Sequence, residues 1–217
     1  MLKIKEVFYS LQGEGFHAGR PTIFIRFSGC NLWSGKTKDK ENSPCYFCDT
    51  DFVGGKKYSI DELANVVYDL IPKSLNNIYI VFTGGEPSLQ VTNEIIFDLK
   101  DKIQTLGIKC SFGIETNGEN DFEFDEDIWV TFSPKTYNFK LKKWSELKLL
   151  YPFGLIPDVF NSYNGIKYLQ PIFNDNYDSN LKMTMDYCLN NDNWRLSIQQ
   201  HKILGIEWHD EIFDWWA

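Results

Sequence analysis

The sequence predicts an α/β protein built either on an open, mostly parallel sheet or on an incomplete barrel. Short runs rich in β-branched and aromatic residues recur along the whole chain, as strands do. Several of these runs are almost continuously apolar, which is typical of strands covered on both faces. Helical patterns occur between only some of them, so we expect some connections to be loops.

The expected strands share a short length and end in a turn signal or a change of pattern. They cover residues 4–10, 22–28, 78–83, 109–115, 128–133, 146–151, 165–170 and 195–200.

Three helices are predicted from capping residues and apolar spacing. Ser59 and Glu62 form a capping-box pattern before a run with helical periodicity. Thr92 is the expected N-cap of a second helix, which Gly107 ends. A third helix is expected over residues 179–189.

Composition indicates one globular domain over residues 1–217. The chain is long enough for one sizeable core, and no repeat or long linker divides it. A net charge of −8 argues against a nucleic-acid binder that uses a basic surface. No apolar run approaches the length of a membrane span, and no export signal is evident at the N-terminus, so a cytoplasmic protein with reduced thiols is expected.

Three of the five cysteines lie close together in the sequence. Cys30, Cys45 and Cys48 follow the pattern C-x14-C-x2-C. Three thiolates fit a zinc site that has a more distant fourth ligand, or an iron–sulfur cluster with one open iron. Cys110, at a strand entrance, and Cys188, on a helix face, are interpreted as buried structural thiols.

Four loops with unusual residues follow expected strands. GCNLW follows 22–28, GGEP follows 78–83, TNG follows 109–115 and PK follows 128–133. The carboxyl ends of parallel strands form one rim, so these loops are expected to meet at a single mouth. Gly84 and Gly85 would let the backbone approach a ligand closely, and Glu86 could accept from an ammonium group.

These motifs resemble those of the radical S-adenosylmethionine (SAM) superfamily and, within it, of the 7-carboxy-7-deazaguanine synthase family of the queuosine pathway. The resemblance is carried by FYSLQGEGFHAGRPTIFIRFSGCNLW, CYFCDT, TGGEPSLQ, ETNG, SPK, YLQP and WRLSIQQHKILGI. It implies an incomplete (β/α) barrel of the radical SAM type with reduced helical content. Residues 31–44 would then be an insert in the cluster loop.

The resemblance implies that Cys30, Cys45 and Cys48 ligate a [4Fe–4S] cluster, which cleaves SAM to a 5′-deoxyadenosyl radical. It also implies Mg²⁺ at Thr50. The residues expected to contact SAM are Phe47, Cys48, Asp49, Gly84, Gly85, Glu86, Glu115, Ser133, Pro134, Lys135 and Gln170.

The implied reaction converts the small molecule 6-carboxy-5,6,7,8-tetrahydropterin to 7-carboxy-7-deazaguanine with loss of ammonia. The expected substrate contacts are Leu11, Gln12, Gly13, Glu14, Arg26 and Thr83. Arg26 would bind the carboxylate, which its guanidinium fork suits. The alternatives are an exposed hairpin turn for LQGEG and a surface ion pair for Arg26. A homodimer and an electron donor such as flavodoxin or ferredoxin are also implied.

Three features depart from the family pattern or are ambiguous. Residues 208–217 form an acidic, tryptophan-rich extension, and Phe173 stands where an acidic residue is expected. His201 is either a pocket residue or a structural histidine. Two alternative functions are a radical SAM activase acting on another substrate and a zinc-stabilised binding module without catalysis.

Metal analysis separates the cluster from the zinc site. Protein purified without oxygen is expected to contain about four irons and four sulfides per chain and to show brown absorbance that SAM perturbs. Stoichiometric zinc, with no iron bound even after anaerobic reconstitution, would contradict the radical mechanism.

Overall fold

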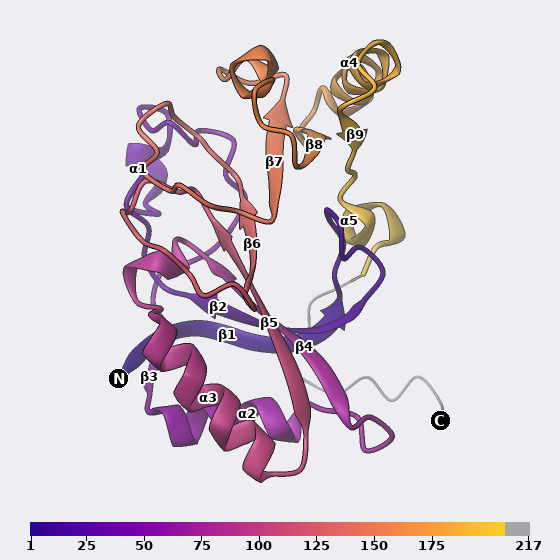
Figure 1. Cartoon of the computed structure of the whole chain (residues 1–217). Helices are drawn as coiled ribbons and strands as arrows, with labels where there is room; N and C mark the ends of the chain where they lie inside the picture. Colours follow the sequence, from indigo (N-terminus) through magenta and orange to yellow (C-terminus); the bar gives the residue numbers. More distant parts are fainter. Residues whose placement is uncertain (207–217) are drawn as a thin grey trace.

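A computed structural model describes residues 1–206, which form one nine-stranded sheet in the order β3-β1-β2-β4-β5-β6-β7-β8-β9 (Figure 1). The strands are β1 (Leu2–Leu11), β2 (Pro21–Phe27), β3 (Lys56–Tyr58), β4 (Asn77–Gly84), β5 (Lys109–Thr116), β6 (Trp129–Phe132), β7 (Glu146–Tyr151), β8 (Ile166–Pro171) and β9 (Arg195–Leu196).

The sheet is curved and open. β1 is antiparallel to both β2 and β3, and all pairs from β2 through β9 are parallel. β3 and β9 form the two edges and do not pair with each other. The expected incomplete barrel is therefore confirmed.

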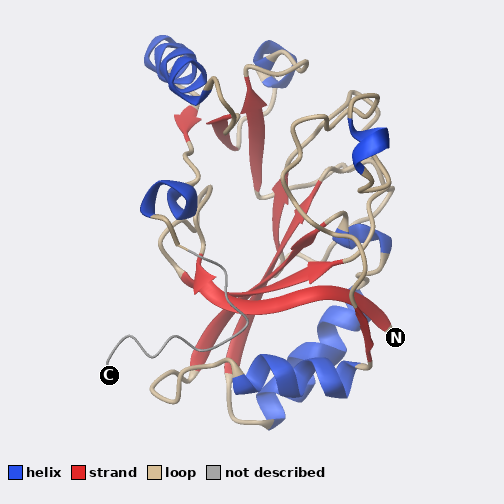
Figure 2. Ribbon diagram, turned by 180° about the vertical axis from the view of Figure 1, so that it is seen from behind, coloured by secondary structure: helices blue, strands red, loops and turns tan. Residues whose placement is uncertain are grey.

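The helices α2, α3 and α4 cover only part of the outer face (Figure 2). The helices are α1 (Thr37–Lys40), α2 (Ile60–Asp69), α3 (Asn93–Thr105), α4 (Tyr177–Asn190) and α5 (Gln200–Leu204), with 3₁₀ turns at Pro87–Leu89 and Pro157–Phe160. α2 and α3 lie side by side beneath the β1, β4 and β5 region, and α4 lies beside β8 and β9. β5, β6 and β7 are joined by loops without helices, as the sequence indicated.

The two predicted helix N-caps, Ser59 and Thr92, are confirmed. The Ser59 hydroxyl accepts a hydrogen bond from the backbone N–H of Glu62, and the Glu62 carboxylate accepts one from the backbone N–H of Ser59. Thr92 accepts from the backbone N–H of Ile95 in the same way. These side chains satisfy N–H groups that the first turn leaves without a helical partner.

The expected strand over 195–200 is wrong beyond Leu196. The Ser197 hydroxyl donates to the Gln170 side chain and accepts from the backbone N–H of Gly15, and α5 begins at Gln200. The Gln200 N–H donates to the Gly13 carbonyl. This segment therefore leaves the strand ladder to pack against the β1–β2 loop. The strand β3 and helices α1 and α5 were not predicted.

The two faces of the sheet bury different residues. The outer face supplies the main core beneath the helices, where Ile25 and Phe27 are fully buried. A smaller inner cluster contains Phe8, Phe24, Tyr79 and Val81. Side chains alternate along a strand, so each buried strand contributes to both sets.

A polar row crosses the inner face. Strand register places Glu115 beside Thr131 and Thr131 beside Glu146, on β5, β6 and β7. The Thr131 hydroxyl donates to Glu146 at 2.7 Å, and the Thr83 hydroxyl on β4 donates to Glu115 at 2.8 Å. Buried polar groups need such partners, so this row marks the inside of the barrel as a site lined by polar groups.

None of the helices within residues 1–206 combines the length and the apolar character needed to cross a lipid bilayer.

The capping box gives a direct test of the fold. Ser59→Ala removes the acceptor for the Glu62 N–H and is expected to lower the free energy of unfolding by about 1 kcal/mol. Ser179→Ala, at an exposed position in α4, is the matched control. Equal midpoints for the two variants in urea denaturation would contradict the assignment.

Candidate active site

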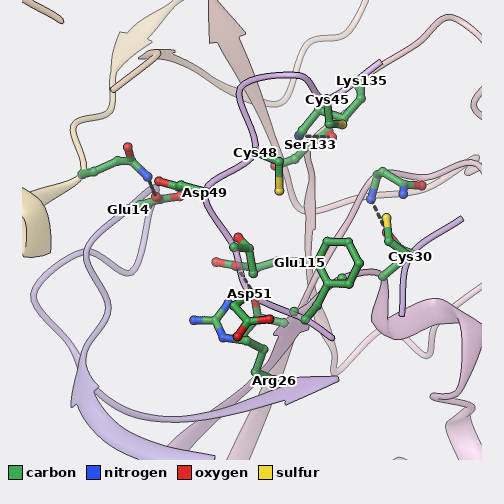
Figure 3. A pocket seen from close by; sticks show the side chains of 18 of the residues that line it. Glu14, Arg26, Cys30, Cys45, Cys48, Asp49, Asp51, Glu115, Ser133 and Lys135 are labelled. Carbon is green, nitrogen blue, oxygen red and sulfur yellow. Dashed lines mark hydrogen bonds between the residues drawn. The ribbon is translucent and has the colours of Figure 1, made fainter. Parts of the chain in front are cut away.

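A cavity of about 480 Å³ opens at the carboxyl ends of the parallel strands (Figure 3). It is lined from β1, β2, β4, β5, β7 and β8 and from the loops that follow the strands. All four loops predicted to meet at one mouth contribute residues to it. Separate parts of the sequence therefore converge on one site.

Most of the predicted site residues line this cavity. Those that do are Gln12, Glu14, Arg26, Cys30, Cys45, Phe47, Cys48, Asp49, Thr50, Thr83, Gly84, Gly85, Glu86, Glu115, Ser133, Lys135 and Gln170. Leu11, Gly13 and Pro134 are not among the lining residues. Gly13 instead packs against α5, where an added Cβ would lie 2.3 Å from His201 Nδ1.

The three clustered cysteines are free and all line the cavity. Figure 3 shows Cys45 beside Ser133 and Lys135, Cys30 apart from them, and the Cys48 thiol pointing into the space between. Burial raises the pKa of Cys30, and it raises the pKa of Cys45 to about 12.

The donor set has the chemistry of an iron–sulfur ligand set, because three free thiols share one cavity. Their sulfur atoms are not gathered to a common point: within residues 1–206, no group of three or more His, Cys, Asp or Glu side chains is arranged to hold a metal ion. The thiols fit a cluster by type and by location, and their side chains would have to turn toward it.

The GGEP loop packs directly on the first cysteine loop. The Gly85 N–H donates to the Phe27 carbonyl and the Glu86 N–H donates to the Gly29 carbonyl at 2.8 Å. A Cβ on Gly85 would lie 1.9 Å from the Gly29 oxygen. The sequence predicts that these glycines admit a ligand; the contact that the structure shows at Gly85 is with the backbone of Gly29, next to Cys30.

Glu86 joins the strand-end loops. It is 1% exposed and accepts hydrogen bonds from the Ser88 hydroxyl at 2.6 Å, the Thr116 hydroxyl at 2.7 Å and the Asn117 N–H at 2.8 Å. Burial raises the pKa of Glu86, although these donors oppose the shift. The Asn117 side chain in turn donates to Asn31 beside the cysteine loop.

Arg26 lies in the cavity wall. Its Nε donates to Glu6 at 2.5 Å, and its guanidinium carbon lies 5.6 Å from the centre of the Phe8 ring. The Arg26 side chain is 17% exposed, and Glu6 and Phe8 line the same cavity. The ion pair that was the alternative interpretation of Arg26 therefore exists, but both of its members line the cavity.

LQGEG is part of the β1–β2 hairpin loop, and it crosses to the far edge of the open sheet. The Gln12 side chain donates to Glu115, and the Phe16 N–H donates to Glu146 at 2.8 Å. In both views the loop lies beside α5. This hairpin loop is therefore packed into the opening of the barrel.

Sequence reasoning missed several cavity residues. Lys148 on β7 is buried and pairs with Glu14, and Lys202 on α5 pairs with Asp49. The Lys202 ammonium also lies 4.8 Å from the centre of the Phe173 ring. A lysine inside the apolar run ELKLL was a signal that could have identified Lys148.

His201 and Lys135 are also cavity residues with shifted titration. Burial lowers the pKa of His201 and outweighs the opposing charge of Glu14. Burial likewise lowers the pKa of Lys135, whose ammonium donates to the Ser133 carbonyl at 2.7 Å. The extension 208–217 lies outside the described residues.

Comparison with known proteins gives consistent results. No protein-family model matches the chain. It is 42% identical over 212 residues to the 7-carboxy-7-deazaguanine synthase of Bradyrhizobium diazoefficiens, covering 94% of this chain and 98% of the relative. It is 38% identical to the 7-carboxy-7-deazaguanine synthase of Burkholderia multivorans, with the same coverage, and 35% identical to that of Bacteroides thetaiotaomicron, covering 95% and 99%.

A solved structure shares the fold. The crystal structure of QueE from Escherichia coli superposes with a TM-score of 0.64 over 92% of this chain and 94% of that chain, at 24% sequence identity.

The contact at Gly85 can be tested directly. Gly85→Ala places a methyl group against the Gly29 carbonyl and is expected to lower the free energy of unfolding by about 1–3 kcal/mol. It should also weaken SAM binding, because the two loops must separate. Urea denaturation and equilibrium dialysis with SAM measure these effects.

Gly154→Ala is the matched control, since an added Cβ there meets no atom within 4 Å. Equal stability and equal SAM affinity for the two variants would show that the loops do not depend on this contact.

Proposed function

The chain belongs to the 7-carboxy-7-deazaguanine synthase family of radical SAM enzymes, and we propose that its reaction takes place in the cavity lined by Cys30, Cys45 and Cys48. The enzyme is a lyase that contracts the ring of 6-carboxy-5,6,7,8-tetrahydropterin with loss of ammonia. The observation that supports this proposal is that three free cysteines, the GGEP loop and Arg26 all line one cavity. Membership of this family excludes the two alternative functions, the radical SAM activase and the zinc-stabilised binding module.

Cys30, Cys45 and Cys48 would hold the [4Fe–4S] cluster. When bound, the cluster and SAM together supply a 5′-deoxyadenosyl radical. The insert at residues 31–44 separates Cys30 from the other two cysteines and includes α1. Trp33 in this insert packs edge-on against Phe52, with ring centres 5.4 Å apart, and this contact joins the start of the insert to the segment that follows Cys48.

The SAM molecule would lie against the strand-end loops. Phe47, with its ring 4.6 Å from that of Phe153, offers an aromatic face for the adenine. The polar groups assigned to the rest of SAM are Asp49, Gly84, Gly85, Glu86, Glu115, Ser133, Lys135 and Gln170. Polar groups that converge from several loops, together with aromatic side chains, are typical of a cofactor site.

The pterin would lie toward β1 and β2. The Arg26 guanidinium suits the substrate carboxylate, and Gln12, Glu14 and Thr83 offer partners for the N–H groups of the pterin ring. Phe8 and Phe24 add an apolar wall that excludes water from this side.

The remaining assignments complete the proposal. Thr50 would contribute one oxygen to Mg²⁺, which also relies on water and substrate oxygens. We also propose a homodimer, an electron donor such as flavodoxin or ferredoxin, and a cytoplasmic location, which suits five free cysteines.

Arg26→Ala tests where the substrate binds. The variant is expected to lose pterin turnover by at least about 100-fold, because a buried carboxylate would lack its counter-ion. Reductive cleavage of SAM without substrate should persist, since the guanidinium is not assigned to SAM. Chromatography of methionine, 5′-deoxyadenosine and product measures both reactions.

Arg195→Ala, at an exposed position in β9, is the control and should match the wild type. Equal loss of SAM cleavage and of pterin turnover in Arg26→Ala would move Arg26 out of the substrate site.

A further inference from the structure

Lys148 places a positive charge in the wall of the cavity. Along β7, Leu147 and Leu149 are fully buried in the outer core, while Lys148 and Leu150 line the cavity. This alternation follows the two-residue repeat of a strand. The Lys148 side chain is 7% exposed, so its ammonium must be paired within the protein.

The ammonium is held between two carboxylates from distant parts of the chain. It forms an ion pair with Glu14 on the hairpin loop and lies 3.7 Å from Glu115 on β5. Glu14 also accepts from the Gln199 side chain at 2.7 Å. Lys148 thus connects the hairpin loop, the inner face of the sheet and, through Glu14, the segment that leads into α5.

The charges around this ion pair keep Glu14 ionised. Burial raises the pKa of Glu14, but the charge and hydrogen bond of Lys148, together with smaller contributions from His201 and Gln199, outweigh it and lower the pKa to about 2. Burial lowers the pKa of Lys148, and the nearby carboxylates outweigh that and raise it overall. The other charged or titratable groups that bear on the pair are Glu115, Glu146, Lys135 and His201.

We propose that Lys148 is a positioning residue for the pterin: it holds the Glu14 carboxylate fixed and ionised as an acceptor in the cavity. The inference rests on the proposed function, in which Glu14 contacts the substrate. A pterin presents an amino group and a ring N–H side by side, a pair of donors that suits one carboxylate. Each Glu14 oxygen accepts one protein hydrogen bond and retains a second lone pair for the ligand.

Without the lysine charge, Glu14 and Glu115 would be two carboxylates in one buried site. Such a pair favours protonation of one member, which then no longer accepts from a donor through that oxygen. The structure therefore assigns to Lys148 an effect on substrate affinity that depends on pH.

Binding of 6-carboxypterin to the enzyme loaded with cluster and SAM, without a reductant, tests this separately from turnover. Near pH 6, Lys148→Gln is expected to weaken binding at least about tenfold relative to wild type. The ratio of the two dissociation constants should shrink toward about pH 7.5, as the Glu14 carboxyl of the variant ionises. Fluorescence anisotropy of the pterin gives the constants.

Two further variants test whether the effect depends on the charge at position 148. Lys148→Arg keeps the charge and should bind within about threefold of wild type. Lys109→Gln, at an exposed strand position, should bind as wild type does. Two results would overturn the proposal. One is equal dissociation constants for Lys148→Gln and wild type; the other is a loss of affinity in Lys148→Gln that is constant with pH and that Lys148→Arg does not restore.

A double variant tests whether Lys148 acts through Glu14. Adding Lys148→Gln to Glu14→Gln should change the dissociation constant by less than about threefold, because the carboxylate it positions is already gone. Glu14→Gln and the double variant can be compared even if Lys148→Gln alone does not fold, because the double variant lacks both charges of the ion pair. A further tenfold loss in the double variant would mean direct contact with the ligand and would contradict positioning.

The proposed function fails by a different result. Wild-type enzyme that neither binds 6-carboxypterin nor converts the tetrahydropterin would overturn both proposals. Wild-type turnover combined with an unaffected Lys148→Gln would overturn only the role of Lys148.

Discussion

The backbone contact between Gly85 and Gly29 is the constraint on which the site depends. β2 and β4 are parallel neighbours, so their carboxyl ends arrive side by side, but only a residue without a Cβ lets the two following loops touch. Glu86 then extends this contact to the next loop by accepting from Thr116 and the Asn117 N–H. The loop that carries Cys30 is thus set by the positions of three adjacent strands.

The polar interior follows from leaving the sheet open. A closed barrel of this size would fill its centre with apolar side chains, whereas here Thr83, Glu115, Thr131 and Glu146 line the inner face. Such groups are costly to bury without hydrogen-bond partners. The hairpin loop supplies partners to Glu115 through the Gln12 side chain and to Glu146 through the Phe16 N–H. The same groups that stabilise the opening therefore form one wall of the site.

Much of the fold could be predicted because its signals are local. The caps at Ser59 and Thr92 act within one turn, and the strands show as apolar runs followed by informative loops. The errors depend on distant contacts: residues 197–200 leave β9 because the hairpin loop lies beside them. Lys148 was missed for the same reason, since its partners are 134 and 33 residues away in sequence. The three thiols were expected in one place, but their directions depend on side-chain rotamers that spacing does not specify.

The hairpin loop also ties the order of folding to the order of synthesis. Glu14 and Gln199 are 185 residues apart, and Gly15 and Ser197 are 182 apart, so these contacts close nearly the longest loops the described chain can form. Contacts of this range form late, because the entropy of loop closure must be overcome first. A nascent chain in which residues 197–200 have not yet left the ribosome can pair β1 with β2. Its hairpin loop still lacks the hydrogen-bond partners that residues 197–200 supply. The wall that the hairpin loop contributes to the cavity is therefore complete only once residues 197–200 have joined it.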